Sequence, residues 1–286
     1  MIKFGPSGNS ERFYEEGYKT TTEAARWVKE NGLDCFEYSF GRGVNIGLQK
    51  AEEIKNAFLE EEVEITVHAP YFINLANPDP IKAQNSFNYI LDSAYACRKM
   101  GGNRIIFHPA SVGKETREVS VSRTVDRFKV LADLIYENGY DDLYFCPETM
   151  GKLNQIGTIE EITEFCKIEP FFIPTVDFGH INAREQGSLK EVDDYLTRLD
   201  YMINALGMEK MKNFHVHFSK IQYTKKGELR HLTFTDDIFG PEFEPLAEAL
   251  IKLDLEPMVI CESAGTQADD AMYMKRAYNR ILNKMK

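Results

Sequence analysis

The sequence predicts an α/β fold, a single-domain (β/α)8 TIM barrel over residues 1–286. Three observations support this prediction. Eight strand-like apolar runs alternate with eight helical segments, an order that favours a parallel sheet. The length of 286 residues suits one barrel of this kind. No linker, low-complexity stretch or shift in composition divides the chain.

The strands are expected where apolar residues are concentrated, at residues 2–6, 35–40, 64–67, 105–107, 143–147, 171–176, 213–218 and 258–261. The helices are expected at residues 20–31, 46–61, 81–100, 119–138, 159–166, 189–206, 243–253 and 269–284. A hydrophilic excursion, residues 222–237, separates the seventh strand from the seventh helix.

Local patterns support the helix boundaries. Thr20 stands three positions before a glutamate and resembles an N-cap, and the helix that follows ends at Asn31-Gly32. The helix after the third strand ends at Gly101-Gly102. Thr158 repeats the capping pattern before the fifth helix. Apolar residues recur at helical spacing in the fourth helix, at Val125, Phe128, Leu131, Leu134 and Ile135.

Six of the expected strands finish on a histidine, an aspartate or a glutamate. In chain order these residues are His68, His108, Glu148, Asp177 followed by His180, His215 with His217, and Glu262. In (β/α)8 barrels the functional side chains lie at the carboxyl ends of the strands. The fold prediction depends on the alternation of strands and helices, whereas the site prediction depends on residue type. Because these observations are partly separate, the two predictions support each other.

The chain contains six histidines, five of them at or just beyond an expected strand end. The sixth, His231, lies in the loop after the seventh strand, and none lies within an expected helix. A lone histidine is more often a core or surface residue than a ligand, but six at one rim favour metal binding. Imidazole combined with carboxylate suits zinc, manganese or iron.

The supply of donors exceeds what one tetrahedral ion needs. We therefore expect a cluster of two or three ions that share a bridging carboxylate. Metal ions a few ångströms apart typically serve phosphoester cleavage. A Ser-His-Asp hydrolase gains no support, because the chain has no G-x-S-x-G elbow.

Composition restricts the class of protein. The five cysteines show no CxxC spacing, which disfavours a disulfide framework and a four-cysteine zinc site. No apolar run approaches the roughly 20 residues of a membrane span, and no signal segment opens the chain, so we expect a soluble cytoplasmic protein. The net charge of −11 argues mildly against nucleic acid, although bound metal ions would add positive charge.

At these residues the chain resembles the endonuclease IV family of apurinic/apyrimidinic endonucleases, in the xylose-isomerase-like barrel superfamily. The most specific motif is His68-Ala69-Pro70-Tyr71-Phe72-Ile73-Asn74-Leu75-Ala76. Shorter motifs follow in the family's order, namely His108-Pro109, Pro147-Glu148-Thr149, Asp177-Phe178-Gly179-His180, His215 with Ser219-Lys220, Arg230-His231 and Cys261-Glu262-Ser263.

The resemblance implies zinc-dependent cleavage of damaged double-stranded DNA on the 5′ side of abasic sites, by a monomer. It implies that His68, His108 and Glu148 hold one zinc. Glu148 would bridge to a second zinc, which is also held by Asp177, His215 and Glu262. His180 and His231 would hold a third zinc. Glu148 and Glu262 are the implied catalytic residues, and the implied DNA-binding residues are Tyr71, Phe72 and Lys220.

The chain departs from the family in three places. Leu229 stands where the family has an aspartate before Arg-His, so the third zinc loses a carboxylate unless Glu228 or His217 replaces it. His217 stands where the family commonly has asparagine. The arginine-bearing loop after the second strand has no clear counterpart in residues 41–45.

The alternative is a sugar isomerase or epimerase on the same barrel that uses one divalent ion, with Glu148 and Glu262 as acid and base. Glu37 on the second strand, the altered loops and the acidic charge favour this alternative. A metal-binding scaffold without catalysis is a third, weaker interpretation. Two or three ions with a basic collar would favour DNA, and the collar candidates are Lys114, Arg123, Lys152, Lys220, Lys225 and Lys226.

Overall fold

Eight parallel strands form the wall of a barrel in the computed structural model of the chain, which describes residues 1–285. The strands are β1 (Lys3–Pro6), β2 (Cys35–Ser39), β3 (Glu64–His68), β4 (Arg104–Phe107), β6 (Tyr144–Pro147), β8 (Thr175–Asp177), β9 (His215–Phe218) and β12 (Met258–Cys261). They form two four-stranded sheets, in the orders β1-β12-β9-β8 and β2-β3-β4-β6. Parallel bridges between Ser7 and Glu37 and between Glu148 and Thr175 join the two sheets. The predicted (β/α)8 barrel is confirmed.

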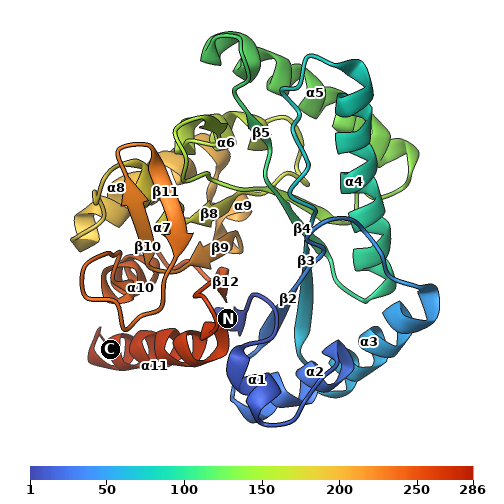
Figure 1. The fold of residues 1–286 in the computed structure, drawn as a ribbon. Coiled ribbons are helices and arrows are strands. Elements are labelled where there is room, and N and C mark those ends of the chain that lie inside the picture. Colours follow the sequence, from blue (N-terminus) through green and yellow to red (C-terminus); the bar gives the residue numbers. More distant parts are fainter. Residues whose placement is uncertain (286) are drawn as a thin grey trace.

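Helices form a ring outside these strands (Figure 1). They include α2 (Thr21–Glu30), α3 (Leu48–Glu60), α4 (Pro80–Lys99), α5 (Arg117–Glu137), α6 (Ile159–Cys166), α8 (Val192–Leu206), α10 (Phe243–Lys252) and α11 (Gln267–Met285). Each matches an expected helix to within a few residues. The capping predictions are confirmed, because Glu23 accepts a hydrogen bond from the backbone of Thr20 and Glu161 accepts one from the backbone of Thr158. None of the helices described in residues 1–285 is long and apolar enough to cross a membrane.

Several short elements were not expected from the sequence. They are α1 (Glu11–Glu15), α7 (Phe178–Arg184), α9 (Met208–Lys212), the paired β5 (Ala110–Ser111) and β7 (Gln155–Ile156), and the hairpin β10 (Ile221–Thr224) and β11 (Gly227–His231). The hairpin replaces the first half of the expected hydrophilic excursion. His180, expected outside every helix, lies in α7, and this helix is too short for periodicity to reveal it. Asp177 caps α7 by accepting a hydrogen bond from the backbone N–H of His180 at 2.7 Å.

Residues on one strand alternate between two apolar environments. On β4, Ile105 and Phe107 belong to the large core between the barrel and its helices, whereas Ile106 packs inside the barrel with Cys146 and Ile173. All five cysteines are buried and free, as expected of small hydrophobic residues. On β9, Val216 and Phe218 contribute to the large core. His215 and His217 therefore face the barrel interior.

Candidate metal centre

Potential metal ligands gather into four groups, three at the rim formed by the carboxyl ends of the barrel strands and one deeper in the barrel. In each group, one donor atom from every member lies within 4.8 Å of the others. The first group is His68, His108 and Glu148, the second is Glu148, Asp177, His217 and Glu262, and the third is His180, Glu228 and His231. A fourth, called here the rear group, consists of Glu37, His215 and His217.

The first group is organised by one carboxylate oxygen. Nε2 of His68 lies 3.3 Å from Oε2 of Glu148, and Nε2 of His108 lies 3.2 Å from the same oxygen. Nδ1 of His68 lies 2.8 Å from the carbonyl oxygen of Ala69, a contact that leaves Nε2 free to bind an ion. The three residues expected to hold one zinc are therefore brought together.

The second group differs from the expected set in its histidine. His215 was expected beside Asp177 and Glu262, but His217 occupies that place. In the β8–β9 register Asp177 is opposite His217, whereas His215 is opposite Thr175. Successive inward-facing residues on a strand stand about 6.6 Å apart, so His215 lies one layer deeper in the barrel. Nδ1 of His217 lies 3.0 Å from Oε1 of Glu148 and 3.5 Å from Oε2 of Glu262.

The third group contains a carboxylate, Glu228, in place of the family aspartate that Leu229 replaces. Oε2 of Glu228 lies 3.4 Å from Nε2 of His180, so Glu228 supplies the acid that Leu229 cannot. Ser219 Oγ lies 2.8 Å from Nδ1 of His231, which directs the other ring nitrogen toward the group. Leu229 is 55% exposed, because Glu228 and Leu229 point to opposite faces of β11.

Gly151 is a site residue that the sequence analysis missed. A Cβ atom at this position would lie 2.7 Å from Cβ of Glu228 and 2.9 Å from the ring of His180. Only glycine therefore allows the third group to form at this spacing. The Gly151-Lys152 dipeptide in the sequence indicates a turn but does not reveal this close approach.

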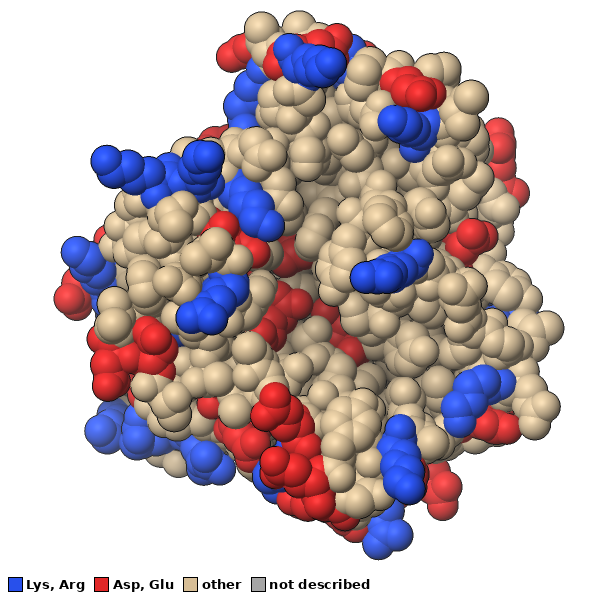
Figure 2. Space-filling view, viewed as in Figure 1, with Lys and Arg blue, Asp and Glu red and all other residues tan. Residues whose placement is uncertain are grey.

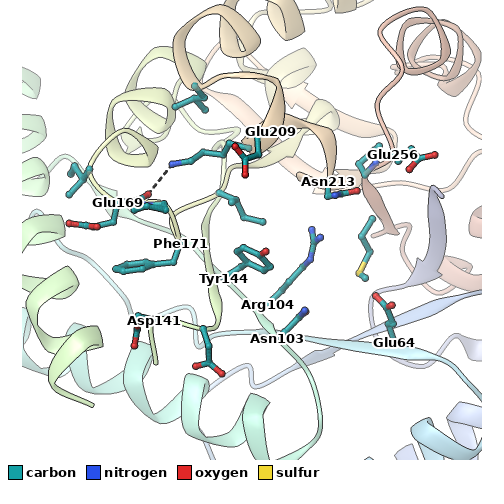
Figure 3. Close-up of a pocket in the computed structure, with 18 of the residues that line it drawn as sticks. Glu64, Asn103, Arg104, Asp141, Tyr144, Glu169, Phe171, Glu209, Asn213 and Glu256 are labelled. Carbon is teal, nitrogen blue, oxygen red and sulfur yellow. Dashed lines mark hydrogen bonds between the residues drawn. The ribbon is translucent and has the colours of Figure 1, made fainter. Parts of the chain in front are cut away.

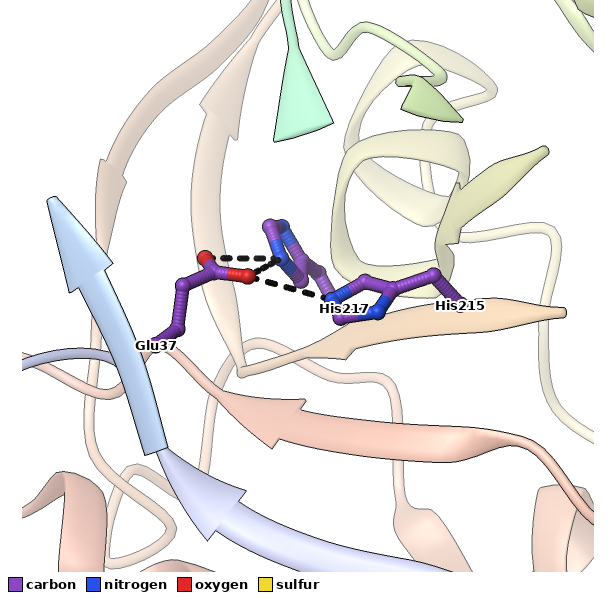
Figure 4. A group of neighbouring side chains, drawn as sticks. All are labelled: Glu37, His215 and His217. Atoms are coloured by element: carbon purple, nitrogen blue, oxygen red, sulfur yellow. Dashed lines mark hydrogen bonds and ion pairs between the residues drawn. The ribbon is translucent and has the colours of Figure 1, made fainter. Parts of the chain in front are cut away.

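The rear group brings Glu37 of β2 against His215 and His217 of β9 (Figure 4). Glu37, His215 and His217 are all fully buried. Oε2 of Glu37 lies 3.1 Å from Nε2 of His215, and Oε1 lies 3.0 Å from Nε2 of His217. Thr66 donates a further hydrogen bond to Glu37 at 3.1 Å. Burial alone would raise the pKa of Glu37, but the two histidines outweigh burial and hold that pKa below its usual value.

The arrangement of carboxylates fits divalent cations. Burial raises the pKa of Asp177 to about 6, and the neighbouring Glu262 and Glu148 add to that rise. Oδ2 of Asp177 is buried and accepts no hydrogen bond in the described residues. A bound cation would neutralise these crowded carboxylates and give Oδ2 of Asp177 a partner. Nitrogen and oxygen donors in this combination suit Zn2+, Mn2+ or Fe2+.

A hollow of about 460 Å3, called here the central hollow, opens above these groups. Its walls include His68, His108, His231, Glu262 and Tyr71. Figure 2 shows acidic side chains deep in the middle of this face and separate basic side chains around it. The volume is in the range of small-molecule and substrate sites.

Tyr71 lines the central hollow, and the adjacent Phe72 is also an exposed aromatic residue. Tyr71 is 60% exposed and Phe72 is 58% exposed. The Tyr71 ring centroid lies 6.1 Å from that of His68 and 6.0 Å from that of His108. Large aromatic residues are usually buried, so this pair is available for contact with a ligand.

The expected basic collar is only partly present. Lys220, expected to contact DNA, is 5% exposed, donates to the carbonyl oxygen of Asp236 and pairs with Glu242 at 2.7 Å. The ammonium group of Lys220 therefore already has partners in this structure, and its contact with DNA stays a prediction. Arg123 pairs with Glu115 at 2.5 Å. Lys152 lies on the wall of the central hollow, 3.9 Å from Glu228.

Comparison with known sequences places these features in a family. The sequence profile described as xylose isomerase-like TIM barrel matches residues 25–279. An uncharacterised protein of Methanocaldococcus jannaschii is 31% identical over 254 residues, which cover 89% of this chain and 90% of that protein. A probable endonuclease 4 of Mycoplasma genitalium is 27% identical over 206 residues, covering 71% of this chain and 67% of that protein.

Solved structures agree on the fold. A D-tagatose 3-epimerase-like protein superimposes with a TM-score of 0.70 at 20% identity, covering 99% of both chains. Endonuclease IV from Thermus thermophilus superimposes with a TM-score of 0.69 at 15% identity, covering 98% of this chain and 99% of that one. Because the two scores are nearly equal, backbone similarity does not separate a nuclease from an epimerase, and the site residues must do so.

Proposed function

The chain belongs to the xylose isomerase-like TIM barrel family, and on that premise we propose that it is a zinc-dependent phosphodiesterase that cleaves DNA on the 5′ side of abasic sites. One observation carries the proposal: the Glu148 carboxylate is shared by two adjoining ligand groups. Its Oε2 faces Nε2 of His68 and of His108 in the first group, and its Oε1 lies 3.0 Å from Nδ1 of His217 in the second. An enzyme that works with one ion has no need of this arrangement.

Two or three zinc ions held by these groups would act as Lewis acids that clamp the attacking and leaving oxygens of a phosphodiester. The contribution of the protein itself is to fix the orientation of the donor atoms. His68, His180 and His231 each have one ring nitrogen within hydrogen-bond distance of a backbone or hydroxyl oxygen, so the other nitrogen faces its group.

We assign the two proposed catalytic carboxylates different roles. Glu148 is 1% exposed and holds the groups together. Glu262 has a side chain that is 17% exposed and lines the central hollow, so it can accept a proton from a water molecule there. Burial raises the pKa of Glu262, but His217 and His231 outweigh burial and keep that pKa below its usual value. Glu262 is thus ionised near neutral pH, as a base must be.

Tyr71 and Phe72 are the proposed contacts to damaged DNA. An abasic site leaves a gap in the base stack, and an exposed aromatic ring can fill it by stacking on the neighbouring base. The probable endonuclease 4 of Mycoplasma genitalium supports DNA as the substrate class. The acidic residues of the central hollow favour a polyanion only when metal ions neutralise them.

The decisive experiment uses a duplex oligonucleotide that carries one tetrahydrofuran abasic analogue, with protein whose metal content has been assayed. We expect incision on the 5′ side of the analogue that is lost in Glu262→Gln. Glu53→Gln, which changes an exposed glutamate in α3, is the matched control and should cleave normally. Protein that holds two or more ions but makes no incision would point to another phosphoester as the substrate.

A divalent-metal sugar epimerase is the second candidate, and one observation favours it. Glu148, Asp177, His217 and Glu262 alone complete a site for one ion, with two glutamates available for proton transfer. Metal stoichiometry separates the candidates, since an epimerase of this kind needs a single ion. One bound ion, together with exchange of a carbon-bound hydrogen of a ketose into solvent deuterium, would favour the epimerase over the nuclease.

A further inference from the structure

A second cavity, called here the lower cavity, lies at the opposite end of the barrel from the metal groups. It has a volume of about 1100 Å3. Several of its lining residues begin strands, namely Lys3 of β1, Glu64 of β3, Arg104 of β4, Tyr144 of β6 and Met258 of β12. Because the proposed metal ligands stand at the other ends of the strands, the lower cavity is separate from the central hollow. Its size is sufficient for a small-molecule ligand.

Arg104 is the feature that points to a ligand. The residue is only 8% exposed, and its Nη1 atom is buried without a hydrogen-bond partner. Its guanidinium carbon lies 5.7 Å from the ring centroid of Tyr144. Figure 3 shows the Arg104 side chain extending into the cavity beside Tyr144. Within residues 1–285 no carboxylate forms an ion pair with Arg104.

The other cations of the lower cavity already have partners. Lys3 pairs with Glu64, Lys167 pairs with Glu164 at 2.6 Å, and Lys210 donates to the backbone carbonyl of Glu169 at 2.9 Å. A buried cation without a partner is costly to the folded protein. An unpaired, planar guanidinium group is complementary to a carboxylate or phosphate, which it can bind through two parallel hydrogen bonds.

The carboxylates that line the lower cavity do not pair with Arg104. Glu256 pairs with the amino terminus at 2.8 Å, and Glu169 accepts a hydrogen bond from Tyr136 at 2.8 Å. Asp141 and Glu209 are exposed at the rim. An acidic rim around one buried cation disfavours a polyanion such as DNA and admits a small anion of low charge.

We propose that the lower cavity binds a small organic anion, whose carboxylate or phosphate group pairs with the guanidinium group of Arg104. Phe171, Ile173 and Met258 supply apolar wall for the body of such a ligand. Asn103 and Asn213 supply amide groups near its polar end. This proposal does not depend on the function assigned to the metal centre.

The test is isothermal titration calorimetry of metal-loaded protein with three probes: inorganic phosphate, benzoate and phenyl phosphate. We expect at least one probe to bind saturably at one site and to bind about tenfold or more weakly in Arg104→Met, the loss expected for charged hydrogen bonds. Binding of benzoate alone identifies a carboxylate ligand. Binding of the two phosphates alone identifies a phosphate ligand.

Matched variants separate this site from the metal centre, which could itself bind phosphate. Glu262→Gln alters the metal centre and should leave the Arg104-dependent binding unchanged. Lys167→Gln alters a rim cation that already has a partner and should also bind normally. Arg104→Lys keeps the positive charge but loses the planar guanidinium group, so it should bind with intermediate affinity. This variant serves as the test if Arg104→Met does not fold. Failure of all three probes to saturate, or equal affinity in the Arg104 variants and the wild type, would overturn the proposal.

Discussion

Glu37 lies directly behind His217, with its Oε1 atom 3.0 Å from Nε2 of the imidazole and both side chains fully buried. The other ring nitrogen faces Glu148 in the second group. A carboxylate behind a ligand histidine fixes the tautomer and direction of the ring, and its loss typically costs about 10–100-fold in metal affinity. We expect Glu37→Gln to weaken binding of the second-group ion by that amount, measured by competition with a zinc chelator.

Thr66→Val is the control for this prediction. It removes one hydrogen bond to Glu37 but keeps the carboxylate charge, so its effect on zinc affinity should be smaller. Equal zinc affinity in Glu37→Gln and the wild type would contradict the positioning role.

His217 and His215 should differ in their effect on metal content. His217→Ala should lose the ion of the second group, because Nδ1 of His217 faces both Glu148 and Glu262. His215→Ala should retain that ion, because His215 faces Glu37 one layer deeper. Metal content after dialysis, measured by inductively coupled plasma mass spectrometry, checks both variants. The reverse pattern would restore His215 as the ligand.

Glu148→Gln should lose more than one ion per chain. Its Oε2 faces His68 and His108 in the first group, and its Oε1 faces His217 in the second, so Glu148 belongs to two groups at the rim. Glu228→Gln is the matched comparison and should lose only the ion of the third group, since Glu228 belongs to that group alone. Equal losses in the two variants would argue against Glu148 as a shared ligand.

Tyr71→Ala should weaken binding to an abasic duplex more than binding to an intact duplex. Loss of one stacking contact costs about 1–3 kcal/mol, so the abasic duplex should bind roughly 5–150-fold more weakly. Fluorescence anisotropy at a fixed salt concentration measures both duplexes. Metal content should not change. Tyr201→Ala, at an exposed tyrosine on α8, is the control, and similar losses in both variants would exclude a specific role for Tyr71.

The metal-free protein should lose stability as the pH rises above about 6.5. Burial lowers the pKa of His180, but Asp177, Glu228 and Glu148 outweigh burial and hold the pKa well above 6.5. Burial likewise lowers the pKa of His217, and Glu262, Glu37 and Glu148 outweigh it. A histidine whose pKa is raised on folding contributes stability that is complete below its unfolded pKa of about 6.5 and is lost through the folded pKa.

Thermal unfolding of chelator-treated protein at pH 6.5 and pH 9 checks this prediction. Each 1 kcal/mol lost should lower the melting temperature by roughly 2–4 °C. Metal-loaded protein should not show this fall, because metal binding displaces the same protons and strengthens as they leave. Matching pH profiles with and without metal would indicate that other groups control stability.

The alternation of strands and helices was sufficient to predict the barrel, because local periodicity and capping decide where each element begins and ends. Thr20 and Thr158 illustrate this, since each cap uses residues only three positions apart. The placement of His68, His108 and Glu148 at one rim follows from the same reasoning, because the carboxyl ends of parallel strands meet at one end of a barrel. The sequence does not reveal the short helix α7, because its seven residues contain too few turns to show a helical period.

By itself, then, the sequence determined the barrel, the rim at which the ligands gather and most of the ligand types, because all of these depend on short-range pattern. Only the tertiary structure decided that His217 joins the second group, that Glu228 completes the third, and that Lys220 is buried. Each of these outcomes depends on register between strands or on contacts between distant segments, such as Asp177 opposite His217. A shift of one residue in register reverses which side chains face inward, and the pattern within a single segment does not specify that register.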